Sequence, residues 1–350
     1  MDEAGKSGNA VEIEGGLERR DVEFIYQLLR QTHWARNRPR DVFERAIKHS
    51  LLIGIIAMLH TLRRGWPVLF LITSLAALAA TDYVGEIQQW RQDFDKDVRT
   101  GGWLSLIGRF KIEEGASKIG SDPSSNVKLT PALATKRVGT LTRHADEFRF
   151  ELAPGLTGTI GSLPLAGPTI LSTKPGTGRI QVGNLRLSVR AVGEDFYLLA
   201  ADVQNPAIRN FKETTWFPIN STHRVEATFI AYDRPEQRRV PMTHVDSKEL
   251  FTSTGEVAFQ LDGKTARLKT FIDDNELFIM FQDETNGKET YGGGRFLHAP
   301  LPKDGKTVLD FNKAFNPYCS VNVYVMCPIP PAENRLKFEI SAGEKYSGQE

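Results

Sequence analysis

The sequence predicts an all-β protein: two antiparallel β-sandwich or barrel domains, preceded by an N-terminal amphipathic helix and an export signal or anchor. Three observations predict this class. An uncharged apolar run occupies residues 66–80, a helical repeat of apolar residues follows it, and from residue 103 onward apolar and polar residues alternate. Alternation puts successive side chains on opposite faces of a strand, and turn residues separate the alternating segments at intervals of about ten residues. Sandwiches and barrels show this pattern, whereas a parallel α/β sheet does not.

The apolar run at residues 66–80 has the features of an export signal. An arginine pair precedes it and small residues end it, so translation from Met58 would give a signal peptide over residues 58–80. The run is shorter than the roughly 20 apolar residues that span a bilayer comfortably. Export followed by cleavage is therefore preferred over a permanent anchor.

Residues 1–57 have two explanations. They are either an upstream extension before the true start, or a cytoplasmic tail ahead of an uncleaved membrane anchor within residues 51–80. Both explanations place residues 81–350 outside the cytosol, in the periplasm or outside the cell. Membrane contact is expected only through residues 51–80.

An amphipathic helix is predicted over residues 82–98. Asp82 is a candidate N-cap, and Gly101-Gly102 ends the pattern, so residues 81–102 make up a helix and a linker. The apolar residues recur at steps of three and four, as one buried helix face requires, and they are Tyr83, Ile87, Trp90, Phe94 and Val98.

Two β-domains are predicted after the linker, a sandwich at residues 103–203 and a C-terminal domain at residues 204–350. Asn205-Pro206 and Phe217-Pro218 interrupt the alternation near the boundary, and Asp262-Gly263 is a hairpin signal. The alternation is clearest in five segments, which are residues 148–152, 185–189, 257–261, 321–325 and 336–340.

Composition excludes several classes of protein. The chain has 44 Lys and Arg against 43 Asp and Glu, and a net charge of +1 lacks the basic excess of a nucleic-acid surface. Two cysteines cannot form a four-thiolate zinc site or a disulfide-rich scaffold. The histidines show no zinc-ligand spacing, and the chain has no Gly-x-Ser-x-Gly elbow. We therefore expect no metal, no cofactor and no nucleic-acid partner.

Residues 115–129 read Gly-Ala-Ser-Lys-Ile-Gly-Ser-Asp-Pro-Ser-Ser-Asn-Val-Lys-Leu. This run is similar to the opening of forkhead-associated sandwiches, which implies a sandwich of that kind at residues 103–203. That family holds phosphothreonine with an arginine after the second glycine and a serine near a later histidine. Here Ser121 follows Gly120, and Lys136-Arg137-Val138-Gly139 occupies the later stretch. The resemblance therefore implies a fold, and no phosphopeptide partner is expected.

Distinctive polar motifs follow one another between residues 281 and 345. Together with Trp103-Leu-Ser-Leu106 and Trp216-Phe-Pro218, they resemble the family called domain of unknown function 1684, over about residues 85–345. The family name implies no activity, so any chemistry has to be argued from the residues. The motifs are Phe281-Gln-Asp-Glu-Thr285, Thr290-Tyr-Gly-Gly-Gly-Arg295, Asp310-Phe-Asn312, Asn316-Pro317, Pro330-Pro-Ala-Glu-Asn334 and Ala342-Gly-Glu-Lys345.

The three consecutive glycines before Arg295 are the most unusual feature of the sequence. Glycine loses much backbone entropy on folding, so such a run indicates positive φ angles or the close approach of another group. One interpretation is an anion-binding nest of backbone N–H groups around Gly293, with Arg295 as a forked donor. The alternative is a tight turn between strands, with Arg295 paired to Asp283 or Asp310.

Three acids in the same region are candidates for acid–base chemistry. If two of Asp283, Asp310 and Glu333 faced one cavity, unequal desolvation would separate their pKa values. The favoured alternative is structural. Asp310 would cap a short helical turn, and Glu333-Asn334 would satisfy backbone groups near the prolines.

Cys319 and Cys327 are a disulfide candidate, because an exported protein favours oxidised thiols. Buried free thiols are the alternative.

These observations lead us to expect an exported protein of uncharacterised function that binds a small anionic or polar ligand, without catalysis, in one C-terminal pocket. A hydrolase that uses paired carboxylates and a structural cell-envelope protein without a ligand are the alternatives. The expected ligand-binding residues are Asp283, Thr285, Tyr291, Gly293, Arg295, Asp310, Asn312, Asn316, Glu333 and Asn334.

Overall fold

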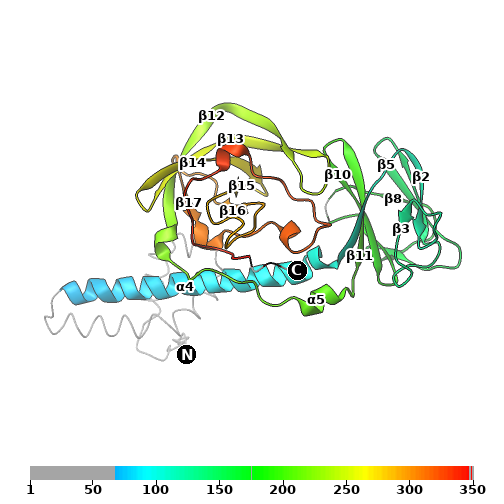
Figure 1. The fold of residues 1–350 in the computed structure, drawn as a ribbon, viewed down its shortest axis with the longest axis horizontal. Helices are drawn as coiled ribbons and strands as arrows, with labels where there is room; N and C mark the ends of the chain where they lie inside the picture. The colour runs from blue at the N-terminus through cyan, green and yellow to red at the C-terminus, as the bar shows by residue number, and fades with distance from the viewer. Residues whose placement is uncertain (1–67, 175, 347, 349–350) are drawn as a thin grey trace, which may run out of the picture. The chain divides into compact units, whose positions relative to one another are not determined.

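The computed structural model describes residues 68–346, apart from Pro175, and also residue 348 (Figure 1). The chain divides into two compact units, Met1–Thr81 and Asp82–Glu350. The predicted extension at residues 1–57 and the first part of the predicted signal or anchor lie outside the described residues. Within the part that is described, no helix is both long and apolar enough to cross a membrane.

Helix α4 (Val68–Thr100) confirms the helix predicted over residues 82–98, but it begins before Asp82, so the predicted N-cap at Asp82 is wrong. Ile87, Phe94 and Val98 are buried, which is the helix face that the apolar repeat predicted. The Phe94 ring lies 5.4 Å from the Trp216 ring and 5.3 Å from the Phe315 ring, measured between centroids. The helix is therefore held to the C-terminal β-domain by aromatic packing.

A sandwich of two sheets follows the helix. One sheet has the strand order β1-β11-β10-β9-β6-β7 and the other β3-β2-β4-β5-β8, with β2 and β3 parallel. The strands are β1 (Leu106–Lys111), β2 (Gly115–Gly120), β3 (Val127–Lys128), β4 (Gly139–His144), β5 (Glu147–Leu152), β6 (Thr159–Ile160), β7 (Leu163–Pro164), β8 (Thr169–Leu171), β9 (Ile180–Val182), β10 (Leu185–Val192) and β11 (Asp195–Asp202).

The two sheets of the sandwich share one core. Phe148 and Phe150 on β5 alternate with exposed residues, whereas Leu185 and Leu187 on β10 alternate with half-buried ones. All four side chains belong to a single buried apolar cluster that takes members from both sheets. The period of two in the sequence is thus the burial period of these strands.

The third sheet is a half-barrel with the strand order β16-β15-β14-β13-β12-β17. The short helices beside the sandwich and this sheet are η2 (Trp103–Ser105), α5 (Pro206–Asn210), η3 (Ser221–His223), η4 (Phe311–Lys313), η5 (Tyr318–Ser320) and η6 (Ala332–Asn334). The strands are β12 (Arg224–Pro241), β13 (Lys248–Leu261), β14 (Lys264–Asp273), β15 (Glu276–Phe281), β16 (Arg295–Ala299) and β17 (Lys306–Asp310).

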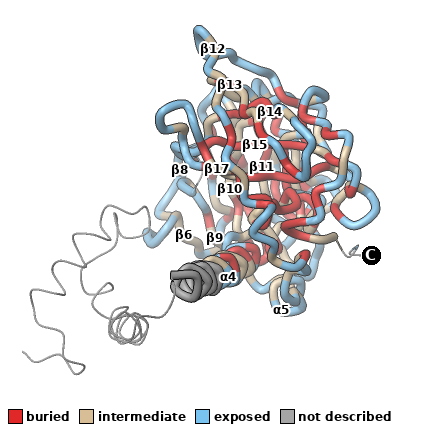
Figure 2. Tube along the Cα trace, turned by 90° about the vertical axis from the view of Figure 1, so that its left-hand side faces the viewer, coloured by how far each residue is buried: buried red, intermediate tan, exposed pale blue. Residues whose placement is uncertain are grey.

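The middle of the third sheet is buried on both faces, and β15 is buried at every position from Leu277 to Phe281, whereas much of β12 is exposed (Figure 2). On the concave face, Phe281 and Phe311 pack with Leu336 and Ile340 from the C-terminal segment. On the opposite face, buried aromatic residues of β14–β16 pack against α4 and against the loop that contains Cys319 and Cys327. Burial on both faces explains why β15 reads as a nearly continuous apolar run rather than an alternating one.

The strands predicted at residues 321–325 and 336–340 are wrong. These segments are irregular, and the alternating apolar residues reach the core from loops: Val325 joins the cluster near α4, whereas Leu336 and Ile340 join the concave core. Pro328, Pro330 and Pro331 separate the segments and supply no backbone N–H for a ladder.

Removing the aromatic contacts of Phe94 with Trp216 and Phe315 should destabilise the whole unit. We expect Phe94→Ala to lower the free energy of unfolding by about 3–5 kcal/mol, because it leaves a cavity among packed rings. The exposed Gln92→Ala on the same helix should change it by less than about 0.5 kcal/mol. Urea unfolding of both variants measures the difference, and equal effects would show that the helix does not pack there in solution.

Candidate functional site

Arg295 and Asp283 form a fully buried ion pair between β16 and the loop after β15. The Arg295 Nε lies 3.1 Å from Asp283 Oδ2, and both side chains have 0% exposure. The remaining guanidinium donors bind main-chain oxygens of the C-terminal segment, Nη1 to Ala342 O at 2.6 Å and Nη2 to Ile340 O at 2.9 Å. Arg295 is therefore fully engaged inside the protein.

The other oxygen of Asp283 orders the loop between β15 and β16. It accepts hydrogen bonds from the Thr285 backbone N–H at 2.8 Å and from the Thr285 hydroxyl at 2.6 Å. Asn286 donates to Tyr291 O at 2.7 Å and closes the loop. Of the expected ligand-binding residues, Asp283, Thr285 and Arg295 thus come together and are joined through Asp283, and Tyr291 is bound to the same loop through Asn286.

The glycine run forms a turn, which is the alternative that the sequence left open. Gly294 has φ +104°, and a Cβ atom there would lie 2.6 Å from Pro330 Cγ and 2.8 Å from Phe281 O. The Gly294 N–H donates to Tyr291 O at 3.2 Å, as in a tight turn. Gly293 lies in this turn and Arg295 is paired with Asp283, so the arginine is not a free anion donor.

Asn334 satisfies backbone groups, as the structural alternative predicted. It is fully buried, and its Oδ1 accepts from the Lys269 N–H at 2.7 Å. Its Nδ2 donates to Lys269 O at 2.9 Å and to Met280 O at 2.8 Å. The neighbouring Glu333 side chain is 43% exposed and pairs with Arg238. Asn334 therefore joins η6 to strands β14 and β15, and Glu333 lies on the surface.

Asp310 and Asn312 form a separate polar cluster with Tyr83 of α4. Asp310 Oδ1 accepts from the Tyr83 hydroxyl at 2.9 Å and from the Asn312 N–H at 3.1 Å, so it caps η4. Asn312 Nδ2 donates to Tyr83 Oη at 2.9 Å and to Asn220 O at 2.8 Å. Burial, and then the negative charge of Asp310, raises the pKa of Tyr83, which keeps its hydroxyl protonated as a donor. Asp283, Asp310 and Glu333 therefore lie in three different surroundings.

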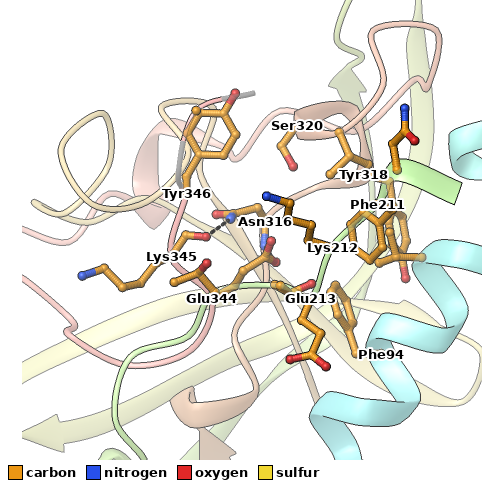
Figure 3. A pocket seen from close by; sticks show the side chains of 16 residues that line it. Phe94, Phe211, Lys212, Glu213, Asn316, Tyr318, Ser320, Glu344, Lys345 and Tyr346 are labelled. Atoms are coloured by element: carbon orange, nitrogen blue, oxygen red, sulfur yellow. Dashed lines mark hydrogen bonds between the residues drawn. The ribbon is translucent and has the colours of Figure 1, made fainter. Parts of the chain in front are cut away.

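A pocket of about 390 Å³ lies beside Asn316 and Glu344 (Figure 3). Four stretches of chain line it: α4, residues 210–215, residues 316–321 and residues 344–348. Asn316 is the one expected ligand-binding residue that lines it. Figure 3 shows Glu344, Asn316 and Ser320 between the rings of Tyr346 and Phe211.

Glu344 is the buried acid of this pocket. One carboxyl oxygen, Oε2, accepts from the Asn316 N–H at 2.7 Å. Among the described residues, no lysine, arginine or histidine nitrogen lies within the 4.0 Å of an ion pair with it. Burial therefore dominates and raises the pKa of Glu344 to about 8. At pH 7 its side chain is mostly a neutral carboxylic acid that can donate a hydrogen bond.

The Asn316 side chain is used to build the pocket wall. Its Oδ1 accepts from the Tyr291 N–H at 3.2 Å, and its Nδ2 donates to Lys345 O at 3.3 Å, the dashed line of Figure 3. The Lys345 ammonium turns away and pairs with Glu289 at 3.1 Å. Lys212, which is exposed, is the cationic side chain that remains on the rim.

The predicted disulfide is not formed, because Cys319 and Cys327 are free and buried thiols. The Cys319 N–H donates to Cys327 Sγ at 3.3 Å, so the two residues are neighbours. A hydrogen bond from Cys327 lowers the pKa of the Cys319 thiol to about 7, and the same contact raises that of Cys327. Burial raises the pKa of the adjacent Tyr291 hydroxyl to about 12. The alternative of buried free thiols therefore holds in the structure.

Sequence reasoning missed Glu344 although its motif, Ala342-Gly-Glu-Lys345, was visible. The preceding Gly343 carried the signal: it has φ +81°, and a Cβ atom there would lie 2.3 Å from Ala314 O. Only glycine fits this position, so the chain turns sharply at Gly343 and directs the next side chain into the pocket.

Residues 209–345 match the family model described as "Protein of unknown function (DUF1684)". The chain belongs to this family. Among solved structures, it is similar to the solution NMR structure of an uncharacterised protein of Haloarcula marismortui. The two share 30% identity over 40% of this chain and 80% of that one, with a TM-score of 0.34. No curated protein matches the chain.

Asn334 provides a test of the structural interpretation of the DUF1684 motifs. We expect Asn334→Asp, which keeps the shape but removes both donated bonds, to lower the free energy of unfolding by about 3 kcal/mol or more. Glu333→Gln next to it breaks only an exposed ion pair, which contributes at most about 1 kcal/mol. Chemical denaturation of both variants distinguishes the roles. A mild effect of Asn334→Asp would argue that this side chain serves a ligand instead.

Glu344 should make stability depend on pH. Below about pH 4.5 the carboxyl is protonated in both states, and between about 4.5 and 8 only the unfolded chain ionises. Stability should therefore fall by up to about 1.4 kcal/mol per pH unit in that window, and level off above it. Glu344→Gln should gain stability over the native protein at pH 8 but not at pH 4.5, whereas the exposed Glu213→Gln should follow the native profile. A Glu344→Gln profile parallel to the native one would contradict the raised pKa.

Proposed function

We propose that the protein binds a small carboxylate in the pocket around Glu344, without catalysing a reaction. The observation that carries the proposal is a buried carboxyl group on the wall of a cavity, held by Asn316 and without a cationic partner in the described part of the chain. A buried acid of this kind is costly unless it is neutral or receives a partner from outside.

The buried donor of the pocket favours an anion. As a neutral acid, Glu344 offers an O–H donor, and a bond of this type to a carboxylate is short and strong. On the rim, Lys212 supplies a positive charge beside the negative charge of Glu213, and Ser320 adds a hydroxyl group. The ligand would therefore meet a donor at its inner end and charges of both signs at the entrance.

The remaining walls favour a ligand with a compact apolar part. The rings of Phe94, Phe211 and Tyr346 line the same cavity. A volume of about 390 Å³ lies in the range of sites for small molecules, which combine apolar walls with a few polar groups. An aromatic or short aliphatic carboxylate has this combination.

One further observation supports binding in this pocket, and another concerns catalysis. Asn316 and Glu344 both fall within residues 209–345, so the polar part of the pocket belongs to the DUF1684 segment. For catalysis, Ser320 has no histidine among the described lining residues to activate it as a nucleophile. The predicted role of Arg295 as the anion donor is replaced here by Glu344, because the guanidinium is bound within the fold.

The proposal predicts a pH-dependent affinity for carboxylates. Because an ionised Glu344 repels an anion and the pKa of Glu344 is about 8, the dissociation constant of the native protein for benzoate should rise by about fivefold from pH 8 to pH 9. Glu344→Gln keeps a neutral donor, so its affinity at pH 7 should stay within about threefold and show no such rise. Isothermal titration calorimetry with benzoate, acetate and benzylamine measures this, with Glu213→Gln as the control on the same rim.

Benzylamine distinguishes the sign of the ligand charge. If benzylamine bound more tightly as the pH rises, and lost binding in Glu344→Gln, the pocket would be a cation site and the carboxylate proposal would be wrong. If none of the three probes gave a binding heat with the native protein, the carboxylate proposal would also be wrong.

A further inference from the structure

We propose a second binding site, for a small phosphorylated molecule, in a groove that the outer face of the sandwich shares with the end of α4. The groove has a volume of about 270 Å³ and shares no lining residue with the pocket around Glu344. Its walls are β10 and β11 on one side, and residues 101–106 with the loop around Lys174 on the other.

The arrangement of β10 creates the basic wall. Leu185, Leu187 and Val189 point into the sandwich core. Because strand side chains alternate, Arg186, Ser188 and Arg190 lie on the opposite face, toward the groove. Arg186 and Arg190 therefore flank Ser188 on the same strand face.

Positive charge dominates the groove. Lys174, Arg179, Arg186 and Arg190 line it, and no aspartate or glutamate is among its lining residues in the described chain. Arg190 pairs with Glu249 at 3.2 Å, and Arg186 has only a weak contact of 3.4 Å to Gln181 Oε1. Lys174 and Arg179 form no ion pair within the described residues.

The helix end does not cancel this charge. The C-terminus of α4 at Thr100 carries a partial negative charge of about half an elementary unit, which alone would repel an anion. The positive charge of Lys174, Arg179 and Arg186, which have no acidic partners among the described residues, exceeds this partial negative charge. Like charges that share a concave surface without counter-charges repel one another, so an anion bound among them relieves that repulsion.

A phosphoryl group fits these donors. It carries up to two negative charges and several acceptor oxygens, and guanidinium groups bind such oxygens in a fork. The hydroxyls of Ser188 and Thr173 lie in the same groove and provide neutral donors. The size of the groove admits a phosphate or diphosphate with a small organic part.

Calorimetric titration of the full chain with pyrophosphate, inorganic phosphate and citrate tests the site. We expect pyrophosphate to bind, and Arg186→Ala and Arg179→Ala each to weaken it by about tenfold or more. Both side chains lie at the surface of the domain, and unchanged thermal unfolding verifies that the variants fold. Arg149→Ala, on the exposed face of the other sheet, should bind as the native protein does.

Each outcome decides between sites and ligand classes. Loss of pyrophosphate binding in Arg186→Ala with retention in Glu344→Gln supports this groove, whatever the result of the carboxylate experiment. Native-like binding by Arg186→Ala and Arg179→Ala overturns the proposal, as does a lack of pyrophosphate binding in the native protein. If citrate binds as tightly as pyrophosphate, the groove does not select phosphoryl groups, and the proposed ligand class is wrong.

Discussion

The buried ion pair between Arg295 and Asp283 fixes the position of the whole C-terminal segment. Removing two charges from water costs several kcal/mol for each ion, and only dense hydrogen bonding offsets this. Here the guanidinium binds Asp283 and also the carbonyl oxygens of Ile340 and Ala342. Those two carbonyls belong to the irregular C-terminal segment that closes the concave core. The guanidinium therefore satisfies backbone groups of this segment that hydrogen bonds to a neighbouring strand would satisfy in a sheet.

The pocket follows from this constraint. Once Ala342 is held, the positive φ of Gly343 turns the chain, and the Glu344 N–H binds Ala314 O at 2.8 Å. The carboxyl group of Glu344 then meets the Asn316 N–H at 2.7 Å. The two segments that form the polar wall are therefore placed by backbone contacts, before any ligand is present. A site that is preorganised in this way loses little entropy on binding.

Sequence patterns predicted the regular elements well and the irregular ones poorly. The period of two located β5, β10 and β13, and the period of three to four located α4, because one buried face gives each its pattern. The same pattern failed at residues 321–325 and 336–340, where separate loops deliver alternating apolar residues to two different cores. For the polar motifs, the sequence identified Asp283, Arg295 and Asn334 as unusual, but it could not show that their partners are one another and the backbone. The sequence could not predict the burial of Glu344, because this burial depends on contacts with residues far away in the sequence.

Asp283 and Glu344 are both buried acids, but only Asp283 has all of its hydrogen-bond partners within the protein. Asp283 receives the guanidinium of Arg295, a hydroxyl and a backbone N–H, and so it is complete within the protein. Glu344 is buried as well, but the donors of Arg295 are already bound to Asp283 and to two carbonyls, so that the cation acts on Glu344 only weakly and from a distance. Its carboxyl group keeps its proton and faces a cavity. An apolar residue at this position would serve a purely structural segment without the cost of a buried acid. In our proposal, this incompletely partnered acid at the wall of a preorganised cavity receives its partner from solution.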